Sequence, residues 1–150
     1  MRKFFVYVFI LIFFNSCAFI QKSDPIYFEW PLKKYKITQK FNSSKKPAHL
    51  GIDLKANSGT KVLSVSSGRV VYAGQKFSGY GKVIIIEHSS HWTSLYSHLS
   101  QIKVKQNQRV KGGQVIGAVG STGRSTGPHL HLELMYNKKN VNPLRYLPSQ

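Results

Sequence analysis

The sequence predicts an all-β domain, built as a barrel or a sandwich of short strands. From Tyr35 onward, short apolar runs follow one another at close intervals, and glycine and serine turns separate them. No segment shows ten residues of convincing helical period. The chain has 150 residues, which gives room for one domain with a single modest core.

The predicted strands follow in chain order from this pattern. They occupy Lys36–Phe41, Lys61–Val65, Gly68–Ala73, Lys82–His88, Thr93–Ser97, Gln114–Val119 and Leu130–Tyr136. A short turn that ends the domain is expected at Asn142–Leu147. The sequence contains no long repeat, no low-complexity tract and no second binding module. We therefore expect one compact β domain preceded by a connector.

The N-terminus has the pattern of an export signal. A positive start, Met1 to Lys3, precedes the apolar run Phe4–Phe14, which is too short to span a bilayer comfortably. Cys17, the single cysteine, follows at once and resembles the acylated cysteine of bacterial lipoproteins. An ordinary cleaved signal and an uncleaved anchor remain the alternatives.

Three segments follow from this interpretation. Residues 1–16 form a signal peptide, residues 17–35 a connector and residues 36–150 the domain. The predicted location is the cell envelope or periplasm, with a lipid at Cys17 holding the chain to a membrane. The sequence leaves open whether that membrane is the inner or the outer one.

The charge is strongly basic, with 22 Lys and Arg against 5 Asp and Glu. Such a field favours polyanionic partners. Because export is predicted, envelope polyanions or an anionic membrane face are expected in place of nucleic acid. The basic residues are scattered, without the interleaved aromatic residues of a single-strand-binding surface, and many of them serve simply as solvated surface.

A His-x-His pair predicts a metal site. On a strand, His129, His131 and Glu133 share one face, and the two imidazoles lie ~6.5 Å apart at the backbone. We expect one of them to bind a metal directly and the other to work beside it. His49 and Asp53 would lie ~13 Å apart on an extended strand, so the chain must bend between them, and a bend or bulge at Gly51 is expected. Three such ligands suit zinc with one position open for water.

A longer set of motifs resembles one family. His49-Leu50-Gly51-Ile52-Asp53-Leu54, Gly79-Tyr80-Gly81, Leu95-Tyr96-Ser97-His98-Leu99-Ser100 and the block from Gly120 to Glu133 occur in the order and spacing of the lysostaphin-type zinc metallopeptidases, also called the M23 or LytM family. The resemblance covers about residues 36 to 148. It implies the family's fold, a compact antiparallel β-sheet of the barrel-sandwich hybrid type.

The resemblance also implies the chemistry. His49, Asp53 and His131 correspond to the ligands of one Zn²⁺ ion, while His98 and His129 correspond to the catalytic residues that do not bind it. One of these two takes a proton from the attacking water and the other stabilises the tetrahedral intermediate. We assign the first role to His129, although the two roles are exchangeable at this stage. The implied activity is zinc-dependent endopeptidase cleavage of peptidoglycan cross-links or stem peptides.

The family also contains members that have lost ligands and activate cell-wall amidases, so a non-cleaving regulatory module is the alternative function. All five residues above are present here.

His88 and His91 are excluded from the site. A position in the cleft explains Tyr96 and Thr126 no better than packing or turn formation does. The short segment between Phe41 and His49 predicts an open cleft. The scissile bond, any amidase partner, the oligomeric state and whether residues 18–35 cover the cleft are left open.

Overall fold

A computed structural model of the chain describes residues 26–88 and 91–149. The predicted signal peptide and Cys17 lie outside these residues. The described strands are β1 (Lys36–Gln39), β2 (Ile52–Lys55), β3 (Lys61–Leu63), β4 (Gly68–Gly74), β5 (Lys82–Glu87), β6 (Trp92–Ile102), β7 (Arg109–Val110), β8 (Val115–Val119), β9 (His129–Tyr136) and β10 (Lys139–Val141). A short 3₁₀ helix, η1 (Pro143–Arg145), follows them.

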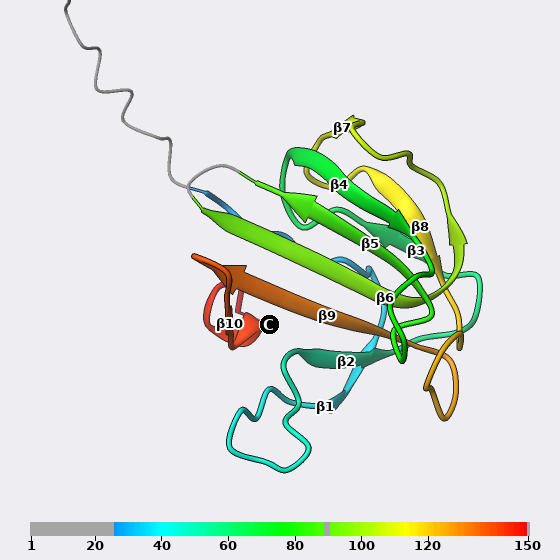
Figure 1. The fold of residues 1–150 in the computed structure, drawn as a ribbon, viewed down its shortest axis with the longest axis vertical. Coiled ribbons are helices and arrows are strands. Elements are labelled where there is room, and N and C mark those ends of the chain that lie inside the picture. The colour runs from blue at the N-terminus through cyan, green and yellow to red at the C-terminus, as the bar shows by residue number, and fades with distance from the viewer. Residues whose placement is uncertain (1–25, 89–90, 150) are drawn as a thin grey trace, which may run out of the picture.

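The strands form one antiparallel system, as the predicted fold class requires. The main path runs β1-β2-β9-β6-β5-β4-β7, while β10 pairs with β9 and the β3–β8 pair joins through β6 (Figure 1). The long strand β6 is shared, because its first half pairs with β9 and its second half with β8. All-β architecture with very little helix is therefore confirmed.

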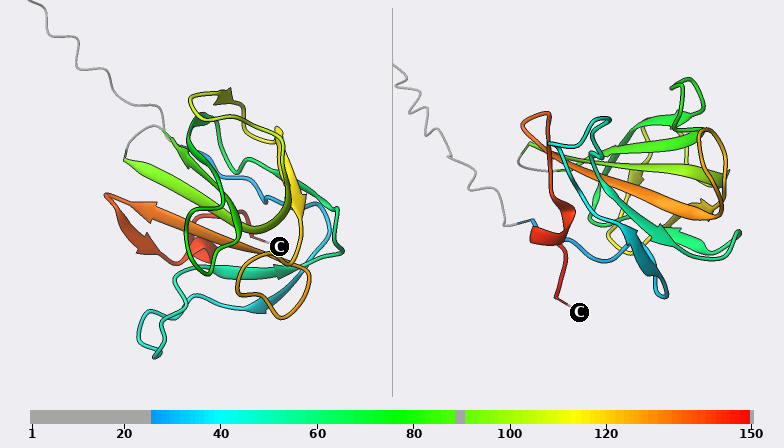
Figure 2. Two further views of the ribbon diagram at one scale, coloured as in Figure 1. Left: turned by 45° about the vertical axis from the view of Figure 1, so that its right-hand side comes forward. Right: turned by 90° about the horizontal axis from the view of Figure 1, so that it is seen from below.

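The sheet closes over one apolar core. Val62 of β3 and Ile116 of β8 belong to the same buried cluster as Ile84 of β5 and Leu132 of β9, so the main path and the β3–β8 pair share one core. Figure 2 shows the twisted strands folded around this interior from two further directions. In the part of the chain that the structure describes, no helix is long and apolar enough to cross a membrane.

Every predicted strand is present, but each of them begins or ends at a residue that differs from the predicted one. β6 extends to Ile102, well past the predicted Ser97, because its second half leaves β9 and finds a new partner in β8. The two-residue strand β7 and the strand β10 were not predicted from the sequence. η1 lies within the expected closing turn, where the Asn142 side chain accepts a hydrogen bond from the Leu144 amide.

The end of the predicted connector packs on the domain. Phe28 and Leu32 are buried in the core cluster, and the Leu63 amide donates to the Pro31 carbonyl at 2.9 Å. Residues 26–35 thus belong to the packed unit. The division into a connector of residues 17–35 and a domain of residues 36–150 stays a prediction, because residues 17–25 lie outside the described chain.

Gly51 permits a close backbone approach between the segment before β2 and strand β9. A Cβ atom at this position would lie 2.3 Å from the Leu132 carbonyl oxygen, and φ of Gly51 is outside the left-handed region. The sequence correctly placed a bend here. The structure shows that the need for glycine is steric, since a side chain would push β2 away from β9.

We predict that Gly51→Ala lowers the free energy of unfolding by about 1–3 kcal/mol, because backbone atoms must move to accept the new methyl group. Urea unfolding of the variant, followed by far-UV circular dichroism, measures the loss. Gly127→Ala is the matched control, since nothing lies within 4 Å of a Cβ there. Equal midpoints for the two variants would contradict the steric explanation.

Candidate active site

Pairing between β2 and β9 places the acidic and imidazole groups side by side. Asp53 lies opposite His131 in the register, and Lys55 lies opposite His129. The alternate residues Leu130, Leu132 and Leu134 of β9 are fully buried in the core. Burial of the leucines therefore fixes which face of β9 carries the histidines, as the period of two predicted.

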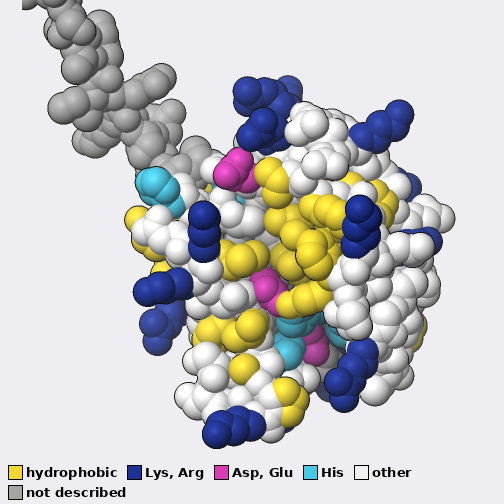
Figure 3. Space-filling model, in the orientation of Figure 1, with side chains coloured by type: hydrophobic (Ala, Val, Ile, Leu, Met, Phe, Trp, Pro, Cys, Tyr) yellow, Lys and Arg dark blue, Asp and Glu magenta, His cyan; other side chains and the backbone are white. Residues whose placement is uncertain are grey.

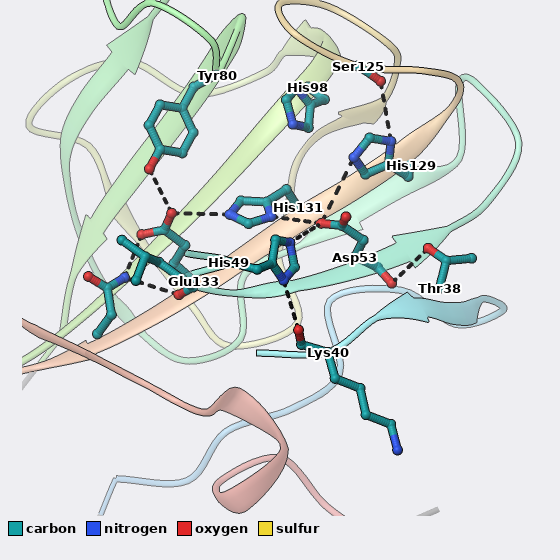
Figure 4. A network of polar contacts seen from close by, with 12 residues as sticks. Thr38, Lys40, His49, Asp53, Tyr80, His98, Ser125, His129, His131 and Glu133 are labelled. Atoms are coloured by element: carbon teal, nitrogen blue, oxygen red, sulfur yellow. Dashed lines mark hydrogen bonds and ion pairs between the residues drawn. The ribbon is translucent and has the colours of Figure 1, made fainter. Parts of the chain in front are cut away.

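His49 reaches the same place through the bend. Asn42 and His49 form an isolated antiparallel bridge, after which the chain turns at Gly51 into β2. The side chains of His49 and His131 then approach Asp53 from two sides (Figure 4). His49 Nε2 lies 3.1 Å from Asp53 Oδ1, and His131 Nδ1 lies 2.7 Å from the same oxygen.

This donor set fits a metal ion. One ligand atom from each of His49, Asp53 and His131 lies within 4.8 Å of the others. Two imidazole nitrogens and a carboxylate oxygen suit zinc, and a tetrahedral ion held by them keeps one position for water. The structure thus brings together the three residues that the resemblance implied as ligands.

The same contacts control protonation when no metal is bound. Burial alone would lower the pKa of His131, but hydrogen bonds to Asp53 and Glu133 outweigh it and raise this pKa to about 9. Burial raises the pKa of Asp53, yet the hydrogen bond and charge of His131, with the charges of His49 and His129, hold it below its usual range. A proton therefore lies between the side chains of Asp53 and His131. A metal cation would favour the same position.

Acceptors behind the two histidines orient them. His49 Nδ1 donates to the Lys40 carbonyl at 2.9 Å, and His131 Nε2 lies 3.1 Å from Glu133 Oε1. Each ring is thus held so that its other nitrogen faces Asp53. Such contacts behind a metal-binding histidine fix its tautomer and its orientation.

Glu133 is itself held by two donors. The Tyr80 hydroxyl donates to Oε1 at 2.8 Å, and the Asn140 amide donates to Oε2 at 2.7 Å. Burial raises the pKa of Glu133, but the hydrogen bond of His131, followed by that of Tyr80, lowers it overall and keeps the carboxylate charged. Burial and the bond to Glu133 raise the pKa of Tyr80.

His98 enters the site through an irregularity in β6. Ser97 pairs with His131 of β9 and Leu99 pairs with Val119 of β8, so His98 lies where β6 exchanges one partner for the other. Its backbone φ of 60° is in the left-handed region, which is uncommon for a residue other than glycine. Strained backbone of this kind is often found at functional sites.

His98 and His129 lie together beside the three candidate ligands, with ring centroids 4.7 Å apart. His98 Nδ1 donates to the Thr122 carbonyl and His129 Nδ1 to the Gly127 carbonyl, each at 2.8 Å. Each of the two rings thus uses Nδ1 as a donor, which leaves Nε2 as its other nitrogen. Burial is the largest influence on His98 and lowers its pKa, which favours the neutral ring.

The five residues line one open cleft of about 680 Å³. Figure 3 shows histidine and acidic side chains gathered on the face drawn in Figure 1, next to a strip of hydrophobic side chains. Thr126 lines this cleft. Tyr96 does not, because its ring is fully buried and its hydroxyl accepts a hydrogen bond from the Val65 amide.

The two excluded histidines lie elsewhere. His88 is buried, with its ring nitrogens against the Ser67 carbonyl and the Ser94 hydroxyl, and burial lowers its pKa. His91 is exposed in the turn before β6. Both lie beside a separate pocket, away from the cleft described above.

Sequence reasoning missed the residues that support the site. Glu133 was placed on the face of His131 by the strand period, but no role was given to it. Tyr80 lies in the motif Gly79-Tyr80-Gly81 but was given no role, and Asn140 lies in none of the motifs. Tyr80 reaches Glu133 from a distant part of the sequence, whereas Asn140 reaches it across the β9–β10 pair, which was not predicted.

Similar curated proteins fall into two groups by their names. The murein hydrolase activator NlpD of Escherichia coli is 42% identical over 121 residues, which cover 81% of this chain and 31% of that protein. The DD-carboxypeptidase/endopeptidase Mpg of Neisseria meningitidis is 48% identical over 96 residues, which cover 64% of this chain and 22% of that protein. This chain thus spans less than a third of the length of either relative.

Solved structures agree with the fold. A zinc-containing peptidase from Vibrio cholerae superposes with a TM-score of 0.77 at 36% identity, covering 81% of this chain and 41% of that one. The catalytic domain of lysostaphin from Staphylococcus simulans superposes with a TM-score of 0.69 at 36% identity, covering 75% and 91% of the two chains. The model of peptidase family M23 matches residues 47–143, and the chain therefore belongs to peptidase family M23.

Proposed function

We propose that this protein is a zinc-dependent endopeptidase that cleaves peptide bonds of bacterial peptidoglycan. The observation that carries this proposal is the convergence of one ligand atom from each of His49, Asp53 and His131 within 4.8 Å, beside two further imidazoles. When bound there, zinc would polarise the scissile carbonyl and make water a nucleophile near neutral pH.

The residues of the chain divide the remaining work. His49, Asp53 and His131 hold the ion, and Glu133 orients His131. His129 takes the proton of the attacking water at Nε2, the nitrogen left with a lone pair when Nδ1 donates to Gly127. A positioned base of this kind contributes roughly 10²–10⁴ in rate. His98 stabilises the charge that develops on the carbonyl oxygen.

The proposed location is the cell envelope, with a lipid on Cys17. Two similar proteins support it by name, the outer membrane antigenic lipoprotein B of Haemophilus influenzae and lipoprotein NlpD of Yersinia enterocolitica. Their identities to this chain are 42% over 134 residues and 44% over 98 residues. An envelope location would bring the cleft to its peptidoglycan substrate.

Amidase activation is the second candidate function, and the relatives named murein hydrolase activators favour it. An activator needs a surface that fits its partner, whereas it does not need a metal site with two additional imidazoles. The complete donor set therefore favours the enzyme.

We expect residues 18–150, which retain every described element, to release peptide fragments from purified sacculi. A chelator and the variant His131→Ala should each abolish release, and added zinc should restore only the chelated wild-type sample. Mass spectrometry of the products would identify the bond. If zinc binds and nothing is released, while a purified amidase is stimulated, the activator function replaces the enzyme.

Zinc binding should release protons. Because the pKa of His131 is about 9 without metal, this ring is charged at pH 7 and must lose its proton to become a ligand. Zinc affinity is therefore expected to rise about tenfold per pH unit from pH 6.5 toward pH 8.5. Calorimetry in buffers of different ionisation enthalpy counts the protons. A zinc affinity that does not vary with pH would contradict the prediction that His131 is protonated in the metal-free protein.

Glu133→Gln is expected to weaken zinc binding about 10- to 100-fold, because the neutral amide supports the His131 ring less well than a carboxylate. Competition with a chromophoric chelator gives the dissociation constant without any activity assay. Glu87→Gln is the control, since Glu87 pairs with Arg69 on the surface. An unchanged constant in Glu133→Gln would show that Glu133 only packs beside the site.

A further inference from the structure

A second cavity lies beside the candidate active site and is strongly basic. Its volume is about 830 Å³, larger than the cleft itself, and it is here called the basic groove. Its apolar walls include Tyr35, Leu63 and Val115. Five lysine side chains also line it: Lys33, Lys34, Lys36, Lys55 and Lys61.

Carboxylates of the described chain do not neutralise these lysines. No aspartate or glutamate is among the residues that line the basic groove, and within residues 26–88 and 91–149 none of the five lysines has a carboxylate within 4.0 Å. Glu29 lies near one end, beside Gly113. Asp53 and Glu133 are engaged with His131, and Glu87 faces Arg69. An anionic partner must therefore come from outside the domain.

The basic groove and the cleft share no lining residue, but strands β1 and β2 contribute residues to both. β2 contributes Asp53 to the cleft and Lys55 to the groove, and β1 contributes Gln39 and Lys36 in the same way. Lys36 lies opposite Lys55, which lies opposite His129. Two residues along a strand span only ~6.6 Å, so an extended peptide of a few residues can occupy both cavities. Figure 1 shows β2 between β1 and β9, the strand that carries His129 and His131.

We propose that the basic groove binds the carboxylate-bearing part of an acidic peptide while the cleft holds the bond to be cut. Ammonium groups at the rim pair with the carboxylates, and the apolar walls contact the aliphatic parts of the same peptide. This inference rests on the proposed function, because stem peptides of peptidoglycan carry several free carboxylates. It narrows the substrate to peptides with acidic groups on one side of the scissile bond.

The position of Lys55 beside the cleft favours a peptide over an anionic lipid. Lys55 lies opposite His129 in the sheet and two residues from Asp53, and both of these residues line the cleft. A lipid headgroup would need only the charges of the lysines. A peptide uses these charges together with the short distance to the cleft along β2.

Binding of two fluorescent peptides to the full chain in detergent tests the proposal. One is an acidic stem-peptide tetramer with free carboxylates, and the other is its fully amidated form. A chelator is present throughout, so the readout needs neither zinc nor cleavage. The double variant Lys55→Gln/Lys61→Gln is expected to bind the acidic peptide roughly 3- to 10-fold more weakly, with a shallower dependence on salt.

The matched control is Lys103→Gln/Lys105→Gln, which removes two exposed lysines outside the basic groove. It should bind like the wild type, and the amidated peptide should bind weakly to all three proteins. Equal loss in both double variants, or equal affinity for both peptides, would overturn the proposal. Displacement of the acidic peptide by phosphatidylglycerol added to the detergent micelles, at concentrations far below those of unlabelled peptide that have the same effect, would replace it with a lipid site.

The two proposals fail in different ways. If sacculi are not cleaved but the acidic peptide still binds through Lys55 and Lys61, the enzyme assignment fails and the basic groove stands. If cleavage depends on zinc while both double variants release fragments and bind peptide like the wild type, the enzyme stands and the basic groove is only a charged surface.

Discussion

The central position of β9 is the constraint on which the rest of the structure depends. One side of this strand buries Leu130, Leu132 and Leu134 in the core, and each such side chain contributes about 1.5–3 kcal/mol to folding. The opposite side must then face the cleft, which places His129, His131 and Glu133 along its lining. β2 and β6 pair with its two edges, so Asp53 and Ser97 both align with His131. Core packing thereby holds the site rigid.

Charge connects the site to the surface around it. The chain has few carboxylates, and those of Asp53 and Glu133 are concentrated where a cation would bind. Within residues 26–88 and 91–149, the lysines of the basic groove have no carboxylate within 4.0 Å. A metal ion at the site would add further positive charge. Such a field favours anionic ligands, which is the class of ligand proposed above for both the cleft and the basic groove.

The names of the relatives divide between activators and peptidases, and family membership alone does not choose between them. Geometry adds an argument that names cannot supply. The left-handed backbone at His98, the support of His131 by Glu133 and the paired rings of His98 and His129 all lie around one point, as the proposed chemistry requires. A surface that only docks a partner has no physical need for this arrangement.

The sequence by itself determined the fold class, most of the strands along the chain and the face of β9 that carries the histidines, because strand period and turn residues are local properties. Its resemblance to a family also singled out His49, Asp53, His98, His129 and His131, which the structure brings together in one cleft. Tertiary structure alone decided how His98 enters the site, since a change of strand partner within β6 leaves no local signature. The support of Glu133 by Tyr80, and the gathering of five lysines around one groove, likewise join distant segments. Contacts of that kind exist only once the sheet has closed over its core.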